Sequence, residues 1–235
     1  MLSGWMLVET TNGVSSPVKT TRRDFLKMVG LAGGSTLVSG RAKAGDAPTL
    51  LEGGENWYGC LVDVSQCEGC RKCEMACNEA NELPDPEVSF DDKSVLDKER
   101  RPSPTEYTVV NRYSAPHPQN PSRTKESFVK VQCMHCNHPG CVSACIVGAL
   151  TKDKATGAVI YDAEKCLGCR YCMVACPFQV PAYEYSNALT PMVRKCQFCF
   201  DRISRAGGLP ACVKMCPQEA ITFGKRDDLS ALARA

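Results

Sequence analysis

The sequence predicts a mixed α+β fold with short elements and long loops, in which bound cofactors replace much of the usual apolar core. Cysteine provides the first observation, because 17 of the 235 residues are cysteines and their spacing is ordered. Aromatic residues make up only 7% of the chain, too few for an aromatic-rich core. Apolar runs are also short, and past the N-terminus none has the 18 residues expected of a membrane span.

The N-terminal residues 1–44 have the features of an export signal. A twin-arginine pair lies within residues 21–27, a glycine-rich, mildly apolar run covers residues 28–40, and Ala42-Lys43-Ala44 resembles an A-x-A cleavage site. An ordinary amphipathic helix is the alternative, but the glycines disfavour it, since each costs about 1 kcal/mol relative to alanine. We therefore expect a Tat signal peptide over residues 1–44 and a periplasmic mature protein.

The charge balance changes when this segment is removed. The chain has 28 basic and 26 acidic residues, a net charge of +2, and residues 1–44 contain six of the basic and two of the acidic ones. The mature chain keeps 22 and 24, a net charge of −2. Such a chain lacks the basic excess that nucleic-acid binding requires.

The predicted secondary-structure elements are short. We expect a strand over residues 57–64, a hairpin over residues 149–161 that turns at 155–157, and another strand over residues 220–223. A helix-like polar run begins at residue 226 and continues into a tail over residues 230–235. Short helical turns are expected after each C-x-x-x-C sequence.

Residues 81–127 differ from the rest of the chain. They contain seven prolines and many charged residues. We expect a long loop or insertion there, and such loops are commonly functional or flexible. A solvated linker and an arm that docks a partner are both open interpretations.

Sixteen of the cysteines fall into four groups, and only Cys60 stands outside them. In chain order the groups are Cys67, Cys70, Cys73 and Cys77; Cys133, Cys136, Cys141 and Cys145; Cys166, Cys169, Cys172 and Cys176; and Cys196, Cys199, Cys212 and Cys216. A shift of 99 residues superimposes group one on group three, and a shift of 71 aligns parts of groups two and four, which indicates duplication. Cys60, on the strand before group one, is expected to be a buried core residue.

The spacing within the groups is that of iron–sulfur ligands. In C-x-x-C-x-x-C-x-x-x-C, the pattern of groups one and three, three thiolates bind one [4Fe–4S] cluster and the fourth reaches a second cluster. Groups two and four widen one gap and keep this three-plus-one logic. Disulfides and structural zinc are the alternatives, but cysteines this crowded suit disulfides poorly, and zinc prefers two separated C-x-x-C pairs. The sequence therefore predicts four [4Fe–4S] clusters, without deciding which groups share them.

Residues beside the ligands are expected to tune the clusters. Gly69 and Gly168 lie between ligands, where a missing side chain lets backbone N–H groups approach sulfur. His135 and His138 lie inside group two, and we expect them beside the ligands or in solvent, because four cysteines are already present there. The basic residues that flank ligands would either stabilise the more negative reduced cluster or be solvated surface charges: Arg71, Lys72, Lys165, Arg170, Arg194 and Lys195.

Residues 57–229 resemble the four-cluster ferredoxin-like electron-transfer subunits found beside molybdopterin oxidoreductases and periplasmic nickel–iron hydrogenases, most closely the Tat-exported hydrogenase-2 type. The resemblance rests on Gln132-Cys133-Met134-His135-Cys136, Tyr161-Asp162, Gly168-Cys169-Arg170-Tyr171-Cys172-Met173-Val174-Ala175-Cys176-Pro177 and Gly207-Gly208-Leu209-Pro210. It implies two bacterial-ferredoxin-like domains that bind two clusters each, one inserted in the other. The outer domain would comprise residues 57–80 and 190–229, and the inner one residues 128–189 after the insertion over residues 81–127.

The resemblance also implies which cysteines share each cluster. The cluster nearest a catalytic partner would be bound by Cys67, Cys70, Cys73 and Cys216, and the next by Cys196, Cys199, Cys212 and Cys77. The third would be bound by Cys133, Cys136, Cys141 and Cys176, and the cluster nearest the membrane by Cys166, Cys169, Cys172 and Cys145.

The implied function is a non-catalytic relay of single electrons between a periplasmic catalytic subunit, with a nickel–iron hydrogenase favoured, and a membrane quinone-reactive or cytochrome subunit. A molybdopterin oxidoreductase is the alternative partner, and a scaffold stabilised by its clusters is the alternative role. We find no nucleophile–base or carboxylate pair placed for catalysis. The hydrogenase relatives continue into a C-terminal membrane anchor, so we expect this chain, which stops at Ala235, either to dock through a membrane partner or to be a shortened form.

Overall fold

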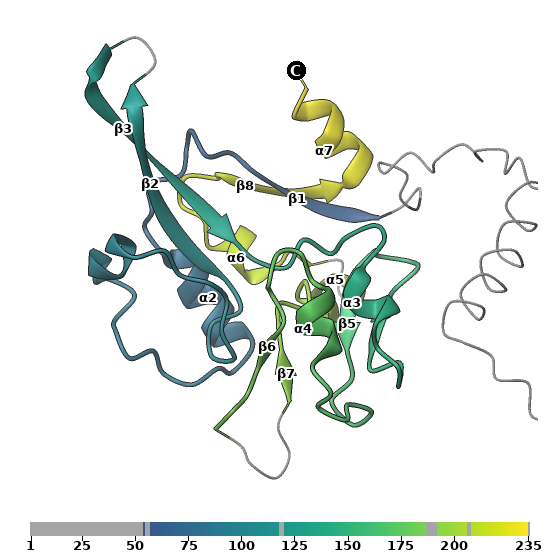
Figure 1. Cartoon of the computed structure of the whole chain (residues 1–235). Helices are drawn as coiled ribbons and strands as arrows, with labels where there is room; N and C mark the ends of the chain where they lie inside the picture. The colour runs from purple at the N-terminus through teal and green to yellow at the C-terminus, as the bar shows by residue number, and fades with distance from the viewer. Residues whose placement is uncertain (1–53, 55–56, 118–119, 187–191, 206–207, 235) are drawn as a thin grey trace, which may run out of the picture. The chain divides into compact units, whose positions relative to one another are not determined.

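Four pairs of antiparallel strands, three of them short, with short helices between them, make up the part of the chain that the computed structural model describes (Figure 1). The predicted signal peptide over residues 1–44 lies outside this part. Within it, no helix is long and apolar enough to cross a membrane. The described residues are 54, 57–117, 120–186, 192–205 and 208–234.

The elements are a mixture of helices and small sheets, which confirms the predicted α+β class. Their order is β1 (Tyr58–Val62), α2 (Lys72–Ala80), the 3-10 helix η1 (Lys93–Asp97), β2 (Val109–His117), β3 (Asn120–Val131), α3 (Gly140–Ser143), β4 (Leu150–Lys152), β5 (Val159–Tyr161), α4 (Tyr171–Ala175), β6 (Ala182–Tyr183), β7 (Val193–Arg194), α5 (Phe200–Arg205), α6 (Ala211–Lys214), β8 (Ile221–Lys225) and α7 (Arg226–Leu232).

Most of the predicted elements are present. The strand expected before group one is β1, the expected hairpin is the antiparallel pair β4–β5, and β8 and α7 follow group four as expected. The helical turns expected after each C-x-x-x-C were wrongly placed, because α2 contains Cys73 and Cys77. The reason is that the left-handed residue Arg71 ends the ligand loop, so that the helix begins before the third cysteine.

The first and last described parts of the chain pack together. Strand β1 pairs with β8 in antiparallel register, with Cys60 opposite Phe223, and α2 packs against α6. Helix α7 covers this small sheet, and its Leu229 is buried against β1 and β8. Because α2 follows the first cysteines and α6 contains Cys212, this packing brings group one close to group four.

The middle of the chain forms a second set of contacts. Helix α3 packs against α4 and β4, and β6 pairs with β7, so groups two and three lie close together. The described residues from 54 onward nevertheless belong to one compact unit. The division into nested ferredoxin-like domains therefore stays a prediction.

The prediction of a loop over residues 81–127 is wrong for the second half of this range. Strands β2 and β3 form a long antiparallel hairpin, drawn in teal in Figure 1, which starts with Val109 opposite Val131. The prolines obscured this pattern. Proline is tolerated on the free edge of a strand, and each strand of a two-stranded sheet has such an edge. Pro116 also lies towards the outer end of the hairpin, beside a register shift. Strand β3 also runs through the predicted boundary between residues 127 and 128.

The apolar core consists of small clusters that contain or contact cysteines. One surrounds Val110 and Ile221 together with Cys73 and Cys212. Another has Cys141 and Cys172 beside buried aliphatic residues. The ligand groups are thus part of the interior of the fold, as expected for a chain with little other core material.

Candidate metal centres

The four C-x-x-C loops have one backbone conformation in common. The residue before the second cysteine has a positive φ in all four: 66° at Gly69, 45° at His135, 69° at Gly168 and 64° at Phe198. This turn directs a backbone N–H towards the preceding ligand, as from Gly168 to Cys166 Sγ and from Phe198 to Cys196 Sγ, both at 3.4 Å. The role expected of glycine is confirmed at Gly168, and two loops adopt the same turn without glycine.

The first cavity lies between groups one and four. Three cysteines of group one and one of group four line it: Cys67, Cys70, Cys73 and Cys216. Burial raises the pKa of Cys73 to about 12, which disfavours the bare thiolate. A group that binds thiolates and supplies positive charge would therefore fit this cavity.

In the second cavity the contributions of groups one and four are exchanged. Three cysteines of group four and one of group one line it: Cys196, Cys199, Cys212 and Cys77. Helix α2 thus places Cys73 at the first cavity and Cys77 at the second. The two linings match the first two ligand sets that the resemblance implies.

The position of Cys60 differs in part from the one that the sequence predicted. It packs against the apolar core as expected, but it also lines the second cavity. Burial, followed by the charge of Cys212, raises the pKa of its thiol. Its place in β1 therefore brings a fifth cysteine to this cavity, and the sequence signal that could have found it is only its proximity to group one.

The cysteines of groups two and three also influence one another. Burial, followed by the charges of the neighbouring thiols, raises the pKa of Cys172 to about 11, and those thiols belong to both groups: Cys141, Cys166, Cys169 and Cys145. Burial also raises the pKa of Cys136, and the charges of Cys133 and Cys176 raise it further. The structure thus brings Cys145 towards group three and Cys176 towards group two.

The cysteine thiols are available as metal ligands. All seventeen are free thiols. Among the described residues, no three His, Cys, Asp or Glu side chains converge on a point where one ion could bind. A [4Fe–4S] cluster makes a different demand from a mononuclear site, because each thiolate binds its own iron at a separate corner.

Two buried lysines, Lys130 and Lys195, and the half-buried Lys152 lie among the cysteine groups, and only Lys195 was identified from the sequence. Lys130 on β3 lines the first cavity. Burial lowers the pKa of its amine, but the charges of nearby thiolates, above all Cys212 and Cys73, raise that pKa above the ordinary value. Lys152 donates to the carbonyls of His135 and Cys136, both at 2.8 Å, and burial lowers its pKa to about 8. These amines could offset the charge of thiolates, but their removal from solvent cannot be read from a local sequence pattern.

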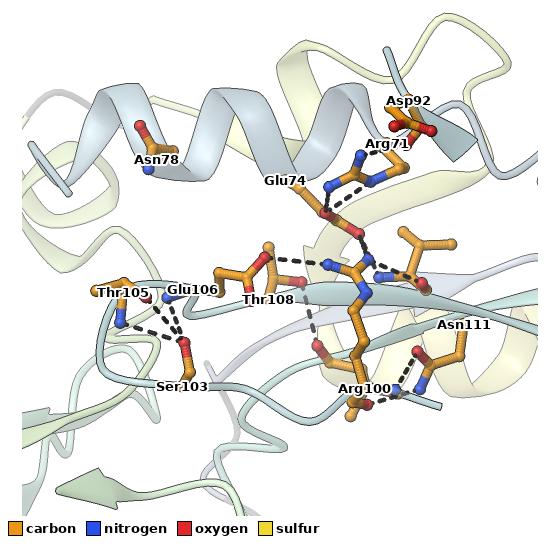
Figure 2. Close-up of polar contacts among 12 residues, drawn as sticks. Arg71, Glu74, Asn78, Asp92, Arg100, Ser103, Thr105, Glu106, Thr108 and Asn111 are labelled. Carbon is orange, nitrogen blue, oxygen red and sulfur yellow. Dashed lines mark hydrogen bonds and ion pairs between the residues drawn. The ribbon is translucent and has the colours of Figure 1, made fainter. Parts of the chain in front are cut away.

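Arg71 is buried rather than solvated, and it lines the first cavity. Its side chain is 1% exposed and forms an ion pair with Glu74 at 3.0 Å, and it donates to the carbonyls of Ser89 and Asp92. Figure 2 shows that Glu74 also faces Arg100, at 2.5 Å. The network joins α2 to the segment that was expected to be a linker, so this part of residues 81–127 is packed against the ligand helix.

The other flanking charges are at or near the surface. Lys165 is exposed and pairs with Asp162, and Arg170 lies over the Tyr183 ring at 5.1 Å. Arg194 lies 3.6 Å from Glu184. Lys72 is exposed, as the solvated interpretation expects, and so is His138. Lys195, in contrast, is buried and donates to the carbonyl of Cys196 at 3.0 Å.

His135 is buried beside a ligand of another group. Its Nε2 lies 3.7 Å from Cys196 Sγ, although His135 itself belongs to the loop of group two. Burial, followed by the charges of Lys195 and Lys152, lowers its pKa well below the usual value. The expectation that this histidine lies beside the ligands is confirmed.

Comparisons with known proteins identify one domain and several relatives. The 4Fe–4S dicluster domain matches residues 124–226. A protein of Nitratidesulfovibrio vulgaris is 50% identical over 214 residues, which cover 90% of this chain and 56% of the relative. Hydrogenase-2 operon protein HybA of Escherichia coli O157:H7 is 36% identical over 223 residues, covering 91% of this chain and 65% of the relative. Thiosulfate reductase electron transfer subunit PhsB of Salmonella typhi is 36% identical over 173 residues, covering 74% and 78%.

The chain therefore spans less than two thirds of the length of the first two of these relatives, and more than two thirds of the third. The matched domain contains groups two, three and four, and group one precedes it.

Proposed function

The chain belongs to the family of ferredoxin-type iron–sulfur electron-transfer subunits of oxidoreductase complexes, and from this membership we propose that it relays single electrons between a catalytic subunit and a membrane quinone-reactive or cytochrome subunit. The observation that carries the proposal is the lining of the first and second cavities. Each has four cysteines from two groups more than a hundred residues apart in the sequence, in the three-plus-one pattern of linked [4Fe–4S] clusters.

We assign four [4Fe–4S] clusters to sixteen cysteines in the sets that the resemblance implies. Cys67, Cys70, Cys73 and Cys216 would bind the first cluster, and Cys196, Cys199, Cys212 and Cys77 the second; the mutual influence of groups two and three supports the other two sets. A bound [4Fe–4S] cluster supplies one-electron redox chemistry. The chain's own contribution is to bind, separate and electrostatically tune the four groups. Catalysis on a substrate would belong to the partner.

For the catalytic partner we favour a nickel–iron hydrogenase, on the resemblance and on the similarity to the hydrogenase-2 operon protein. A molybdopterin oxidoreductase is the second candidate, because the thiosulfate reductase subunit is also 36% identical, over 173 residues against 223. The identity of the relatives therefore does not distinguish the two, and the proteins that co-purify with the chain would.

The two ends of the proposed relay would face different partners. The first cavity would lie towards the catalytic subunit. At the other end Cys169 is exposed, and the apolar side chains beside it are exposed too, Leu167 by 70% and Val174 by 87%. Such a surface supports docking of a second protein near that cluster, and we propose the membrane subunit. The twin-arginine segment would export the loaded protein to the periplasm.

Iron analysis and redox titration together test this function. The mature protein should contain about 16 iron and 16 acid-labile sulfide per chain, because each of four clusters has four of each. About eight iron, or stoichiometric zinc, would refute the four-cluster assignment. A scaffold role would appear as clusters that cannot be reduced and reoxidised reversibly, whereas the relay requires reversible reduction.

A further inference from the structure

His135 occupies a positive-φ backbone position that is glycine in groups one and three and phenylalanine, Phe198, in group four. The equivalent residues of groups one and three are Gly69 and Gly168, and all three have positive φ. A side chain at such a position is uncommon, and histidine is among the residues that tolerate it best. The imidazole at this position must therefore be explained by what it contacts.

Two contacts determine the orientation of the ring. The backbone N–H of Val159 donates to His135 Nδ1 at 2.9 Å, and the ring stacks on Phe198, with 4.7 Å between ring centroids and planes 23° apart. Because Nδ1 accepts a hydrogen bond, the ring proton is on Nε2. That nitrogen faces Cys196 Sγ at 3.7 Å, within the range of a hydrogen bond to sulfur.

We propose that His135 is a positioning residue whose Nε2–H donates to the Cys196 thiolate and raises the reduction potential of the cluster assigned to the second cavity. The inference rests on the proposed function, since it concerns a ligand of one of the four clusters. A hydrogen-bond donor at sulfur stabilises the extra negative charge of a reduced cluster, so its presence raises the potential.

The same residue connects two cluster sites. His135 is covalently next to Cys136 of group two, and its ring reaches Cys196 of group four, 61 residues away in the sequence. The rigid support from Val159 and Phe198 holds this connection in one geometry. His135 therefore also lies on a continuous bonded route between the second cavity and the neighbouring cluster of group two.

Two substitutions remove the donor without disturbing the turn. His135→Gly restores the residue that the loops of groups one and three have at this position, and His135→Asn keeps a side chain that tolerates positive φ but is too short to reach Cys196. His138→Gln is the matched control, because His138 is in the same loop and exposed. Each protein is loaded with clusters, analysed for iron, and titrated with electron paramagnetic resonance detection.

The expected result is full iron content in all proteins, with the midpoint potential of one cluster shifted downward in both His135 variants and unchanged in His138→Gln. Full iron content with unchanged potentials in both His135 variants would overturn the role of His135 and leave the proposed function intact. Failure of the unmodified protein to bind clusters would instead refute the proposed function, and this inference with it.

A second measurement decides the matter if the His135 variants lose iron. The chain has three histidines, so a His117→Gln, His138→Gln double variant labelled with ¹⁵N-histidine retains only His135 as a labelled residue. Pulsed electron paramagnetic resonance of its reduced clusters should detect a weak ¹⁵N coupling on one cluster. Absence of that coupling would contradict the hydrogen bond to Cys196.

Discussion

Replacing Glu74 with glutamine should loosen the two proposed cluster sites that share helix α2. The Glu74 carboxylate is 2% exposed and pairs with Arg71 at 3.0 Å and Arg100 at 2.5 Å. It also accepts the backbone N–H of Val110 at 2.6 Å. Glu74→Gln keeps an acceptor for Val110, but it leaves the buried Arg71 guanidinium without its ion-pair partner and Arg100 with only Glu106 (Figure 2).

The magnitude follows from burial. Removing one partner of a buried ion pair costs about 3–5 kcal/mol, because the remaining charge stays desolvated. With a guanidinium dependence of about 4 kcal/mol/M for a chain of this size, the unfolding midpoint should fall by about 1 M. Because α2 contains both Cys73 and Cys77, the variant should lose iron from the first and second cavities at a lower guanidinium concentration than the unmodified protein.

Guanidinium unfolding of the loaded protein, followed by far-ultraviolet circular dichroism and visible iron–sulfur absorption, measures both effects. Glu106→Gln is the control, because Glu106 pairs only with Arg100 in this network, at 3.0 Å, and its side chain is 30% exposed. A partly exposed pair contributes less than about 1 kcal/mol, so that midpoint should move by about 0.2 M or less. Equal shifts in the two variants would refute the argument from burial.

Two further predictions concern export and ligand identity. Replacing Arg22 and Arg23 with lysine should leave the precursor in the cytoplasm, because the export receptor recognises the arginine pair; normal periplasmic accumulation would show that the motif is accidental. Cys60→Ala should retain all four clusters, whereas Cys166→Ala should lose or degrade one, as judged by iron content and electron paramagnetic resonance. The structure makes the first half of this test stringent, since Cys60 lines the second cavity, and an altered spectrum in Cys60→Ala would overturn the assignment of sixteen ligands.

Local features of this protein could be predicted from the sequence because short-range covalent geometry determines them. The spacing of Cys67, Cys70 and Cys73 requires a tight loop whatever the rest of the chain does, and Gly69 marks the turn within it. The hairpin β4–β5 likewise depends on a turn and two short strands that are adjacent in the sequence. The repeat of group one in group three is visible in the structure as matching left-handed residues, Arg71 and Arg170.

The tertiary structure decided which distant residues meet. The pairing of β1 with β8 and the packing of α2 on α6 bring Cys73 and Cys216 to one cavity, a choice that the spacing within each group leaves open. The burial of Lys130, the ion pairs of Glu74 and the reach of His135 to Cys196 arise in the same way. Each depends on contacts between segments far apart in the chain, and desolvation acts only once those segments enclose a side chain, so no local pattern of residues encodes it.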